Sequence, residues 1–398
     1  MILPRLRPEL NVSPSPDPQN PGLYIRDHYR FTEAWLIIPA FLAQRLSFFD
    51  GGHTQAELAA EFARLSNQAN AADTAQHLFE ALDKAGFLEN ETFTQLRDAK
   101  YQAFVQSPVR QAAHVFDTAE NIHATLQGFL VGETPVLRPH PVGIAAPHVS
   151  PGGGARSYGA AYRQLTPDLK DRTFVILGTS HYGQANRFGL TRKPFETPLG
   201  ITRTDPALLD LLAAQPTVIQ EDYCHAIEHT IEFQVIFLQH LYGPDVKILP
   251  LLCGSFYPSI YNNGKPEDDD LVHRFFETLG EIAEQRAEQL YWILGVDMAH
   301  IGLRYGDPIA AHAEQEHLLR VRERDHDRIQ SLNAGDATTF WEKIRENHDD
   351  LRWCGSAPFY SFLKIMPNAR GTLQHYEQWN IDPDSVVSFA GISFFHTP

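Results

Sequence analysis

Several hydrophobic segments of the sequence end in side chains that can hold a metal or move a proton. One ends at His148, a second at His181, and a third at Asp297 followed closely by His300. Imidazole and carboxylate ligands suit divalent iron, zinc, copper or manganese, and two histidines with one further ligand leave positions open for a substrate. The segment ends therefore indicate a metal site of the catalytic type, provided that the fold brings them together.

Chance must be weighed against this interpretation, because the chain contains 19 histidines. A single histidine at the end of a strand is more often a hydrogen-bonded structural residue than a ligand. The pair His148 and His181 is a stronger signal, since the ends of parallel strands lie at the same edge of a sheet.

A further segment, residues 222–234, places His225 and His229 four residues apart and does the same with Glu228 and Glu232. On a continuous helix each pair would share one face. The spacing is not the HExxH zinc motif, whose glutamate directly follows the first histidine. We expect His225 and Glu228 to belong to a solvated acidic face, whereas His229 and Glu232 can equally support the cleft or act as acid–base groups.

The cysteines add one more candidate ligand. Cys224, Cys253 and Cys354 are an odd number without a paired framework, which favours a reducing, cytoplasmic compartment. Cys253 lies inside an apolar run and is expected to behave as a small hydrophobic residue. Cys354, between Trp353 and Gly355, is better placed to offer a thiolate.

From about residue 138 onward, short apolar segments alternate with longer segments of helical period. This alternation predicts an α/β fold with a mixed or mostly parallel sheet and helices on both faces. In such sheets, ligands bind in the crevice beyond the carboxyl ends of the strands, where the candidate residues stand. The last apolar segment, residues 386–395, alternates less cleanly and is expected at an edge of the sheet.

The first part of the chain has a different rhythm. Residues 1–22 are rich in proline and are expected to form a loosely held arm. An amphipathic helix is predicted before the turn at 50–52, and Thr54 with Glu57 has the spacing that caps a second helix.

A third helix is predicted at 74–88 and a short hairpin at 87–96, which together outline a small winged-helix-like α+β unit. The sequence of this region resembles the small peptide-binding winged helices of the PqqD-like type. We therefore predict a winged-helix-like domain with its arm at 1–110, a helical linker at 111–137, and an α/β metal-binding domain at 138–398.

Charge and hydropathy exclude some classes of protein. The formal net charge is −16, no basic cluster offsets it, and the candidate recognition helix carries Asp73, Glu80 and Asp83. A nucleic-acid surface is therefore not expected. No segment reaches about 18 consecutive apolar residues, and the proline-rich start lacks the apolar core of a signal peptide. We expect no membrane partner.

An ordered set of short motifs resembles one known family. The stretches APH (146–148), ILGTSH (176–181), EHTIEFQVIFLQHLYG (228–243) and GVDMAH (295–300), followed by CG (354–355), resemble the Memo family. In bacteria this family appears as the AmmeMemoRadiSam system protein B, and its fold is similar to the class III extradiol dioxygenases. The resemblance covers about residues 140–396 and leaves out the N-terminal region.

The resemblance implies a metal held by His148, His181 and Cys354. It places His229, Asp297 and His300 beside the metal as polar groups of the cleft, which makes them the catalytic candidates. The implied metal is iron, with copper or zinc as alternatives. The dioxygenase relatives use two histidines and a glutamate, so a thiolate is a departure that would alter the redox behaviour of the metal.

Two further departures concern the surroundings of the site. Many family members carry a second histidine where this chain has Tyr182, and some carry Arg-His-Pro where this chain has Ser356, Ala357 and Pro358. These changes leave the implied ligands in place but alter the proton donors of the cleft, so the small-molecule substrate does not carry over.

Three functions remain open at this level. The first is an iron oxidoreductase of the dioxygenase type, with His229 or His300 moving protons and Asp297 fixing a histidine tautomer. The second is a metal-binding protein without turnover that works with a radical-SAM protein or a peptide partner. The third is metal-assisted hydrolysis with Asp297 or Glu232 as general base.

Overall fold

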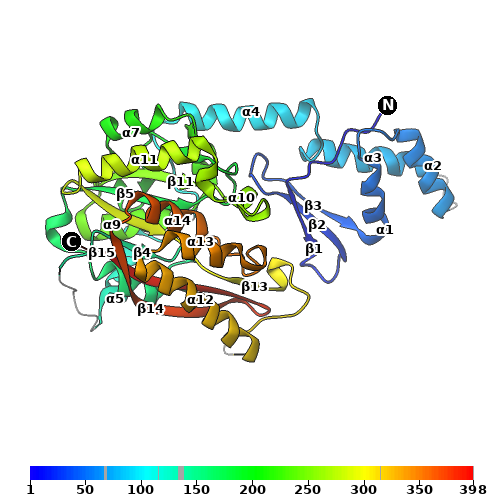
Figure 1. Ribbon diagram of the computed structural model, residues 1–398. Coiled ribbons are helices and arrows are strands. Elements are labelled where there is room, and N and C mark those ends of the chain that lie inside the picture. Colours follow the sequence, from blue (N-terminus) through cyan, green and yellow to red (C-terminus); the bar gives the residue numbers. More distant parts are fainter. Residues whose placement is uncertain (67–69, 115, 133–138, 314, 398) are drawn as a thin grey trace. The chain divides into compact units, whose positions relative to one another are not determined.

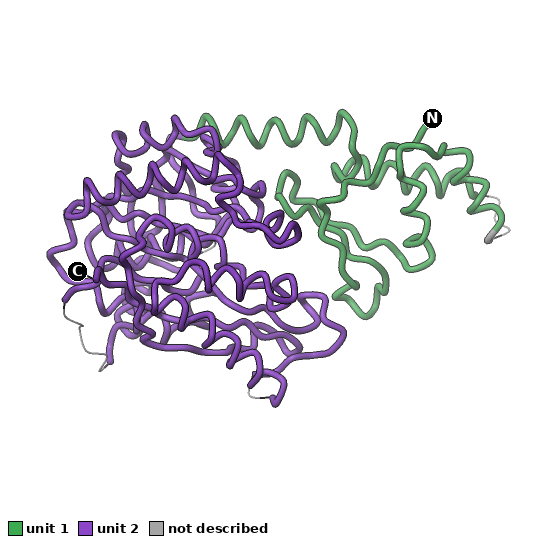
Figure 2. The backbone as a smooth tube through the Cα atoms, in the orientation of Figure 1, with its two compact units in different colours: residues 1–107 green, residues 108–398 purple. Residues whose placement is uncertain are grey.

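The computed structural model describes residues 1–66, 70–114, 116–132, 139–313 and 315–397. The chain divides into two compact units, residues 1–107 and residues 108–398 (Figures 1 and 2). Within the described residues, no helix is both long enough and apolar enough to cross a membrane.

The first unit is a small α+β domain, as the composition of its segments predicts. It begins with a three-stranded antiparallel sheet in the order β1-β2-β3 and continues with helices. These elements are β1 (Leu10–Pro14), β2 (Gly22–Asp27), β3 (Trp35–Pro39), α1 (Ala40–Ala43), η1 (Gln44–Phe48), α2 (Gln55–Ser66), α3 (Ala71–Lys84) and α4 (Glu91–Gln106).

The proline-rich start is not a loose arm, and that prediction was wrong. Leu3 is fully buried in the core of the unit, and β1 pairs with β2 over its whole length. Arg7 is also buried, and it donates hydrogen bonds to the carbonyl oxygen of Gly86 at 3.0 Å and to Asp27 at 2.9 Å. The proline content of residues 1–22 does not reveal these buried contacts, because a few well-placed side chains suffice to fix a segment.

One helix prediction and one hairpin prediction in this unit also need correction, while the predicted cap of a second helix is confirmed. The segment Trp35–Pro39 is strand β3, because its aromatic and β-branched residues suit a pleated surface. The predicted hairpin at 87–96 is instead the start of α4, where the side chain of Asn90 accepts a hydrogen bond from the Phe93 amide. Thr54 and Glu57 form the predicted reciprocal cap of α2.

The second unit is built on a ten-stranded mixed sheet, which confirms the predicted α/β fold. The path runs β10-β6-β11-β5-β12-β4-β15-β13, with β14 paired to β15 and β9 paired to β11. The strands are β4 (Gly143–Ala146), β5 (Thr173–Thr179), β6 (Phe188–Leu190), β9 (Arg203–Thr204), β10 (Val218–Gln220), β11 (Lys247–Cys253), β12 (Leu290–Gly295), β13 (His300–Gly302), β14 (Ala369–Asp382) and β15 (Ser385–His396). The central strands β11, β5, β12 and β4 are parallel.

A separate two-stranded sheet and the helices complete the unit. They are β7 (Glu196–Thr197), β8 (Gly200–Ile201), α5 (Ala119–Leu130), α6 (Ala155–Tyr162), η2 (Pro167–Leu169), α7 (Pro206–Ala213), α8 (Cys224–Ile227), α9 (Glu232–Tyr242), α10 (Tyr257–Tyr261), η3 (Pro266–Asp268), α11 (Asp270–Gln285), η4 (Leu303–Tyr305), α12 (Glu316–Ala334), α13 (Ala337–Arg345), η5 (Glu346–His348) and α14 (Ser356–Ile365).

Helices cover both faces of the large sheet. Along β5, Phe174 and Ile176 pack in the same hydrophobic cluster as Phe237 of α9, together with α5 and α6. Val175 and Leu177, which point the other way, pack in the cluster that includes α11 and α14. This alternation is the two-period of a strand that is buried on both sides.

The last strand is not at an edge, contrary to the sequence prediction. β15 lies between β14 on one side and β4 and β13 on the other. Its residues are almost all buried, whereas those of β14 are mostly half-buried. Residues 369–382 form β14, which pairs with β15. Their polar, half-buried pattern did not indicate a strand.

Candidate metal centre

The candidate residues stand just beyond three neighbouring parallel strands. His148 lies shortly after β4, His181 after β5, and Asp297 after β12. Gly295 of β12 pairs with Ala146 of β4, so the ends of these strands are level. Parallel register thus brings residues from distant parts of the chain to one edge of the sheet.

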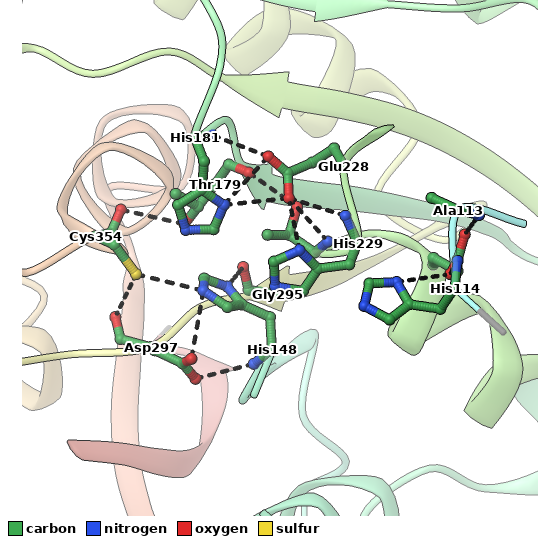
Figure 3. A network of polar contacts seen from close by, with 12 residues as sticks. Ala113, His114, His148, Thr179, His181, Glu228, His229, Gly295, Asp297 and Cys354 are labelled. Carbon is green, nitrogen blue, oxygen red and sulfur yellow. Dashed lines mark hydrogen bonds and ion pairs between the residues drawn. The ribbon is translucent and has the colours of Figure 1, made fainter. Parts of the chain in front are cut away.

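Three histidines converge at this edge. One ligand atom from each of His148, His181 and His229 lies within 4.8 Å of the other two. The ring centroids are 5.0 Å apart for His148 and His181, 5.3 Å for His148 and His229, and 5.4 Å for His181 and His229 (Figure 3). We call these residues the histidine triad; it could hold a divalent metal.

His229 reaches the triad because the helix is interrupted beside it. α8 ends at Ile227, and Glu228 has the extended backbone angles φ −82° and ψ 140°. The chain resumes as a helix only at Glu232. The segment is therefore not a continuous helix, and the break turns both Glu228 and His229 toward the strand ends.

Glu228 is the residue that the sequence interpretation misplaced most clearly. It is 2% exposed, so it does not belong to a solvated acidic face, and neither does the buried His225. Its carboxylate accepts hydrogen bonds from the backbone amides of His181 and His229, both at 2.9 Å. The same carboxylate lies 3.2 Å from Nδ1 of His181 and 3.1 Å from Nδ1 of His229.

The third imidazole is oriented in the same way by a different acceptor. Nδ1 of His148 lies 3.0 Å from the carbonyl oxygen of Gly295. Each triad member therefore has an oxygen acceptor at Nδ1, which favours the tautomer whose Nε2 carries a lone pair. This is the arrangement that metal-binding histidines use.

Cys354 and Asp297 flank the triad on the His148 side. The Sγ atom of Cys354 is 3.4 Å from Nε2 of His148 and 3.7 Å from the carbonyl oxygen of Asp297. One carboxylate oxygen of Asp297 accepts from the His148 amide at 2.9 Å, and the other lies 3.3 Å from Nε2 of His148 (Figure 3).

The two carboxylates beside the triad differ in charge behaviour. Burial raises the pKa of Asp297 to about 7, in spite of its bonds from the amides of His148 and Val149. Burial acts on Glu228 in the same direction, but His181 and His229 outweigh it and hold the pKa of Glu228 well below its usual range. Glu228 is thus ionised at neutral pH, whereas Asp297 can exchange a proton there.

The surrounding sequence has clear relatives. A family model described as Memo-like protein matches residues 116–393, which is more than half of the chain. The chain belongs to the Memo-like protein family. The matched part contains the whole histidine triad together with Cys354 and Asp297.

Several curated relatives support this membership. A MEMO1 family protein of Aquifex aeolicus is 25% identical over 390 residues, covering 95% of this chain and 97% of the relative. A second, from Thermococcus kodakarensis, is 27% identical and covers 63% of this chain and 85% of its own length. The Aquifex relative therefore also spans the N-terminal unit.

Among solved structures, an uncharacterized protein of Escherichia coli K12 matches with a TM-score of 0.39 and 12% identity. The match covers 64% of this chain and 98% of that protein. At this score the likeness supports no statement about function.

His300 of the Memo-like unit is not a member of the histidine triad. His300 begins β13, and its Nδ1 lies 2.9 Å from the carbonyl oxygen of Met298 and 3.1 Å from that of Arg352. Burial lowers the pKa of His300 to about 4, so this ring is neutral at physiological pH. Its ring also packs edge-on against Tyr305.

A cavity of about 390 Å³ opens beside the triad on the side of His181 and Cys354. The exposed aromatic rings of Tyr257 and Tyr261 contribute to its wall. The side chain of His181 is 29% exposed, whereas that of His148 is 3% exposed. A small molecule in this cavity would therefore approach the triad from the His181 side.

Sequence reasoning missed the groups that orient the triad. Glu228 was visible only as an acidic residue directly before a histidine, and the acceptor for His148 is a backbone carbonyl, which leaves no side-chain signal. Glu232, considered as a general base, instead forms a buried ion pair with Arg110. Arg110 gives no signal in the sequence, because a single arginine after a helix is common.

Proposed function

We propose that the Memo-like unit is a non-haem metal oxidoreductase that binds one divalent metal, iron, through the histidine triad. The observation that supports this most is the convergence of three imidazoles whose Nδ1 atoms all face oxygen acceptors. Nitrogen-rich sites suit iron, copper and zinc, and orientation of the ligands by neighbouring carboxylates strengthens them. When bound, iron supplies a one-electron redox couple and a Lewis acid.

Cys354 is proposed as a further ligand beside His148. Its sulfur is at contact distance from Nε2 of His148, so it borders the space between the rings. Burial raises the pKa of its thiol, partly offset by His181, so the free protein carries it as a thiol. Binding of a metal by Cys354 therefore releases a proton.

The remaining predicted residues are proposed to move or hold protons. Asp297 faces Nε2 of His148 and has a pKa near neutrality, which suits a group that exchanges a proton at working pH. His300, fixed by two carbonyl oxygens, is proposed to shape the neighbouring loop and to act on substrates that reach it. The cavity beside His181 is proposed to admit a small organic substrate.

The test is anaerobic purification with metal analysis, followed by oxygen-consumption assays with a panel of catechols. We expect stoichiometric iron in the wild type and its loss in His148→Ala, His181→Ala and His229→Ala. His123→Ala is the matched control, because His123 is an exposed histidine that contacts His240 instead of the triad.

Each outcome decides between the functions. Iron together with oxygen consumption supports the oxidoreductase. Bound metal without turnover on catechols or on hydrolysable esters favours a metal-binding protein that serves a radical-SAM protein or a peptide partner. Full metal occupancy in a His148→Ala/His181→Ala double variant would contradict the site itself.

A further inference from the structure

We infer that Arg110 is a positioning residue of the metal centre, which sets the orientation of Glu228 and through it of His181 and His229. The inference rests on the proposed metal binding by the histidine triad. Arg110 precedes the part of the chain that the family model matches, which begins at residue 116. It therefore adds a support to the site from outside that part.

Arg110 holds the backbone on both sides of the helix break. Its Nε donates to the carbonyl oxygen of His225 at 2.7 Å, and one terminal nitrogen donates to the carbonyl oxygen of Glu228. The other terminal nitrogen pairs with the carboxylate of Glu232 at the start of α9. One guanidinium thus ties together the end of α8, the break and the beginning of α9.

The guanidinium is itself held rigidly. Arg110 is 1% exposed, and its side chain packs over the ring of Phe195 at 4.8 Å. Its backbone amide donates to the carbonyl oxygen of Pro194 at 2.8 Å, and its carbonyl accepts from the Glu196 amide at 2.9 Å. A planar donor fixed in this way can impose a geometry on the groups that it binds.

Glu232 extends the contact to the chain that follows Arg110. Its carboxylate accepts from the backbone amides of Ala113 at 2.7 Å and His114 at 3.1 Å. The ring of His114 then lies 5.4 Å from that of His229 (Figure 3). It also lies 4.9 Å from the ring of Phe233. Segment 110–114 therefore flanks His229 on the side away from His148.

The amide of Glu228 keeps a helical hydrogen bond to the carbonyl oxygen of Cys224 at 2.9 Å, whereas its own carbonyl oxygen lies beyond the end of α8 and is held by Arg110. Arg110 donates a hydrogen bond to the carbonyl oxygen of Glu228, while the carboxylate of Glu228 accepts from the backbone amides of His181 and His229. Rotation of the peptide at Glu228 would move its carboxylate away from both Nδ1 atoms. Those two imidazoles would then lose the acceptor that selects their tautomer.

A gain in stability alone does not explain the buried ion pair between Arg110 and Glu232. A buried ion pair gains little over well-packed apolar residues of similar volume, because desolvation of both charges offsets their attraction. The fork of hydrogen bonds to two carbonyl oxygens at the break is a feature that an apolar pair cannot reproduce. Geometry at the site is thus the property that this arginine supplies.

The experiment compares Arg110→Lys with an Arg110→Met/Glu232→Gln double variant, which leaves no unpaired buried charge. Lysine keeps a cation for Glu232 but loses the planar fork. The control is Arg7→Met in the first unit, where Arg7 is equally buried and pairs with Asp27. Each protein is prepared metal-free with ¹⁵N-labelled histidine, and thermal melting is recorded beside the site measurements.

Two readouts report on the site. Long-range ¹H–¹⁵N NMR gives the imidazole tautomers, and titration with iron(II) under anaerobic conditions gives the affinity. We expect His181 and His229 to be protonated at Nδ1 in the wild type and in Arg7→Met, and to become tautomer mixtures in both Arg110 variants. Iron affinity should fall roughly 10- to 100-fold in those two variants, as for other outer supports of metal ligands.

Wild-type tautomers and wild-type iron affinity in both Arg110 variants would overturn the inference. If the wild type binds no iron, the proposed function fails, but the tautomer measurement on the metal-free proteins still decides whether Arg110 positions the two rings. If the double variant does not fold, Arg110→Lys alone provides both readouts.

Discussion

Two buried carboxylates support the candidate metal centre, and they do so in different ways. Glu228 contacts two members of the histidine triad and is ionised, because His181 and His229 hold its pKa low. Asp325, on α12, is fully buried and its pKa is raised by burial. The first fixes the imidazoles, and the second fixes the loops beside them.

The contacts of Asp325 show how it acts at a distance. Its carboxylate accepts from Nε1 of Trp353 at 2.6 Å, from the hydroxyl of Tyr376 at 2.8 Å and from the hydroxyl of Ser388 at 2.6 Å. Trp353 directly precedes Cys354, and Ser388 accepts from the amide of Ala299, which lies between Asp297 and His300. Orientation of the triad imidazoles and placement of the neighbouring residues are thus separate tasks, carried by different carboxylates.

The largest expected effect follows from removing Asp325. In Asp325→Ala three buried donors lose their acceptor, which we expect to lower the free energy of unfolding by about 3 kcal/mol or more. Asp325→Asn should cost less, since the amide oxygen still accepts. Denaturant unfolding measures both. A change of iron affinity larger than the change of stability in Asp325→Asn would contradict the division of tasks.

Glu228→Gln should have the opposite effect, with a larger change in iron affinity than in stability. The amide keeps the size of the side chain but removes the charge and places a donor against one imidazole. We expect iron affinity to fall roughly 10- to 100-fold, while the melting temperature changes little. Anaerobic iron titration measures the first and thermal melting the second. A fully retained affinity would show that the carboxylate does not orient the ligands.

The raised pKa of Asp325 also predicts a pH dependence. The folded protein binds this proton more tightly than the unfolded chain, so this group favours folding at low pH. Its contribution is lost as pH rises above the unfolded value of about 4, with a slope of at most about 1.4 kcal/mol per pH unit. Between pH 4 and 7, the free energy of unfolding should depend less on pH for Asp325→Asn than for the wild type. An identical slope would sink this assignment.

Tyr376→Phe should give the smallest effect. It removes one of three donors to Asp325 and leaves the aromatic ring in place, so we expect a loss of about 1 kcal/mol in the free energy of unfolding. Iron content, measured in the same preparations, should not change. A loss of iron in this variant would mean that the support under Trp353 and Cys354 reaches the ligands directly.

The outline of the centre was predictable because it follows from strand periodicity. Apolar runs that end on His148, His181 and Asp297 are local signals, and parallel pairing of their strands makes their ends meet. The α/β fold itself follows from the same alternation. These features depend on residues close in sequence and on one general property of sheets.

The features that escaped prediction depend on distant partners. Glu228 looks like a surface acid until the helix break and the two histidine amides are known, and β14 looks like a polar segment until β15 is found beside it. In the first unit, Arg7 anchors a proline-rich segment through Asp27 and Gly86. Burial of a polar side chain depends on where its partner lies, and composition does not report that.

The break at Glu228 has a mechanical consequence. One carboxylate serves the rings of His181 and His229, which lie nearly parallel with an interplanar angle of 3°, so a displacement of one ring would strain the contact of the other with Glu228. His181 lines the cavity and His229 does not. We therefore expect a molecule that displaces His181 in the cavity to disturb His229 as well, although it makes no contact with that ring.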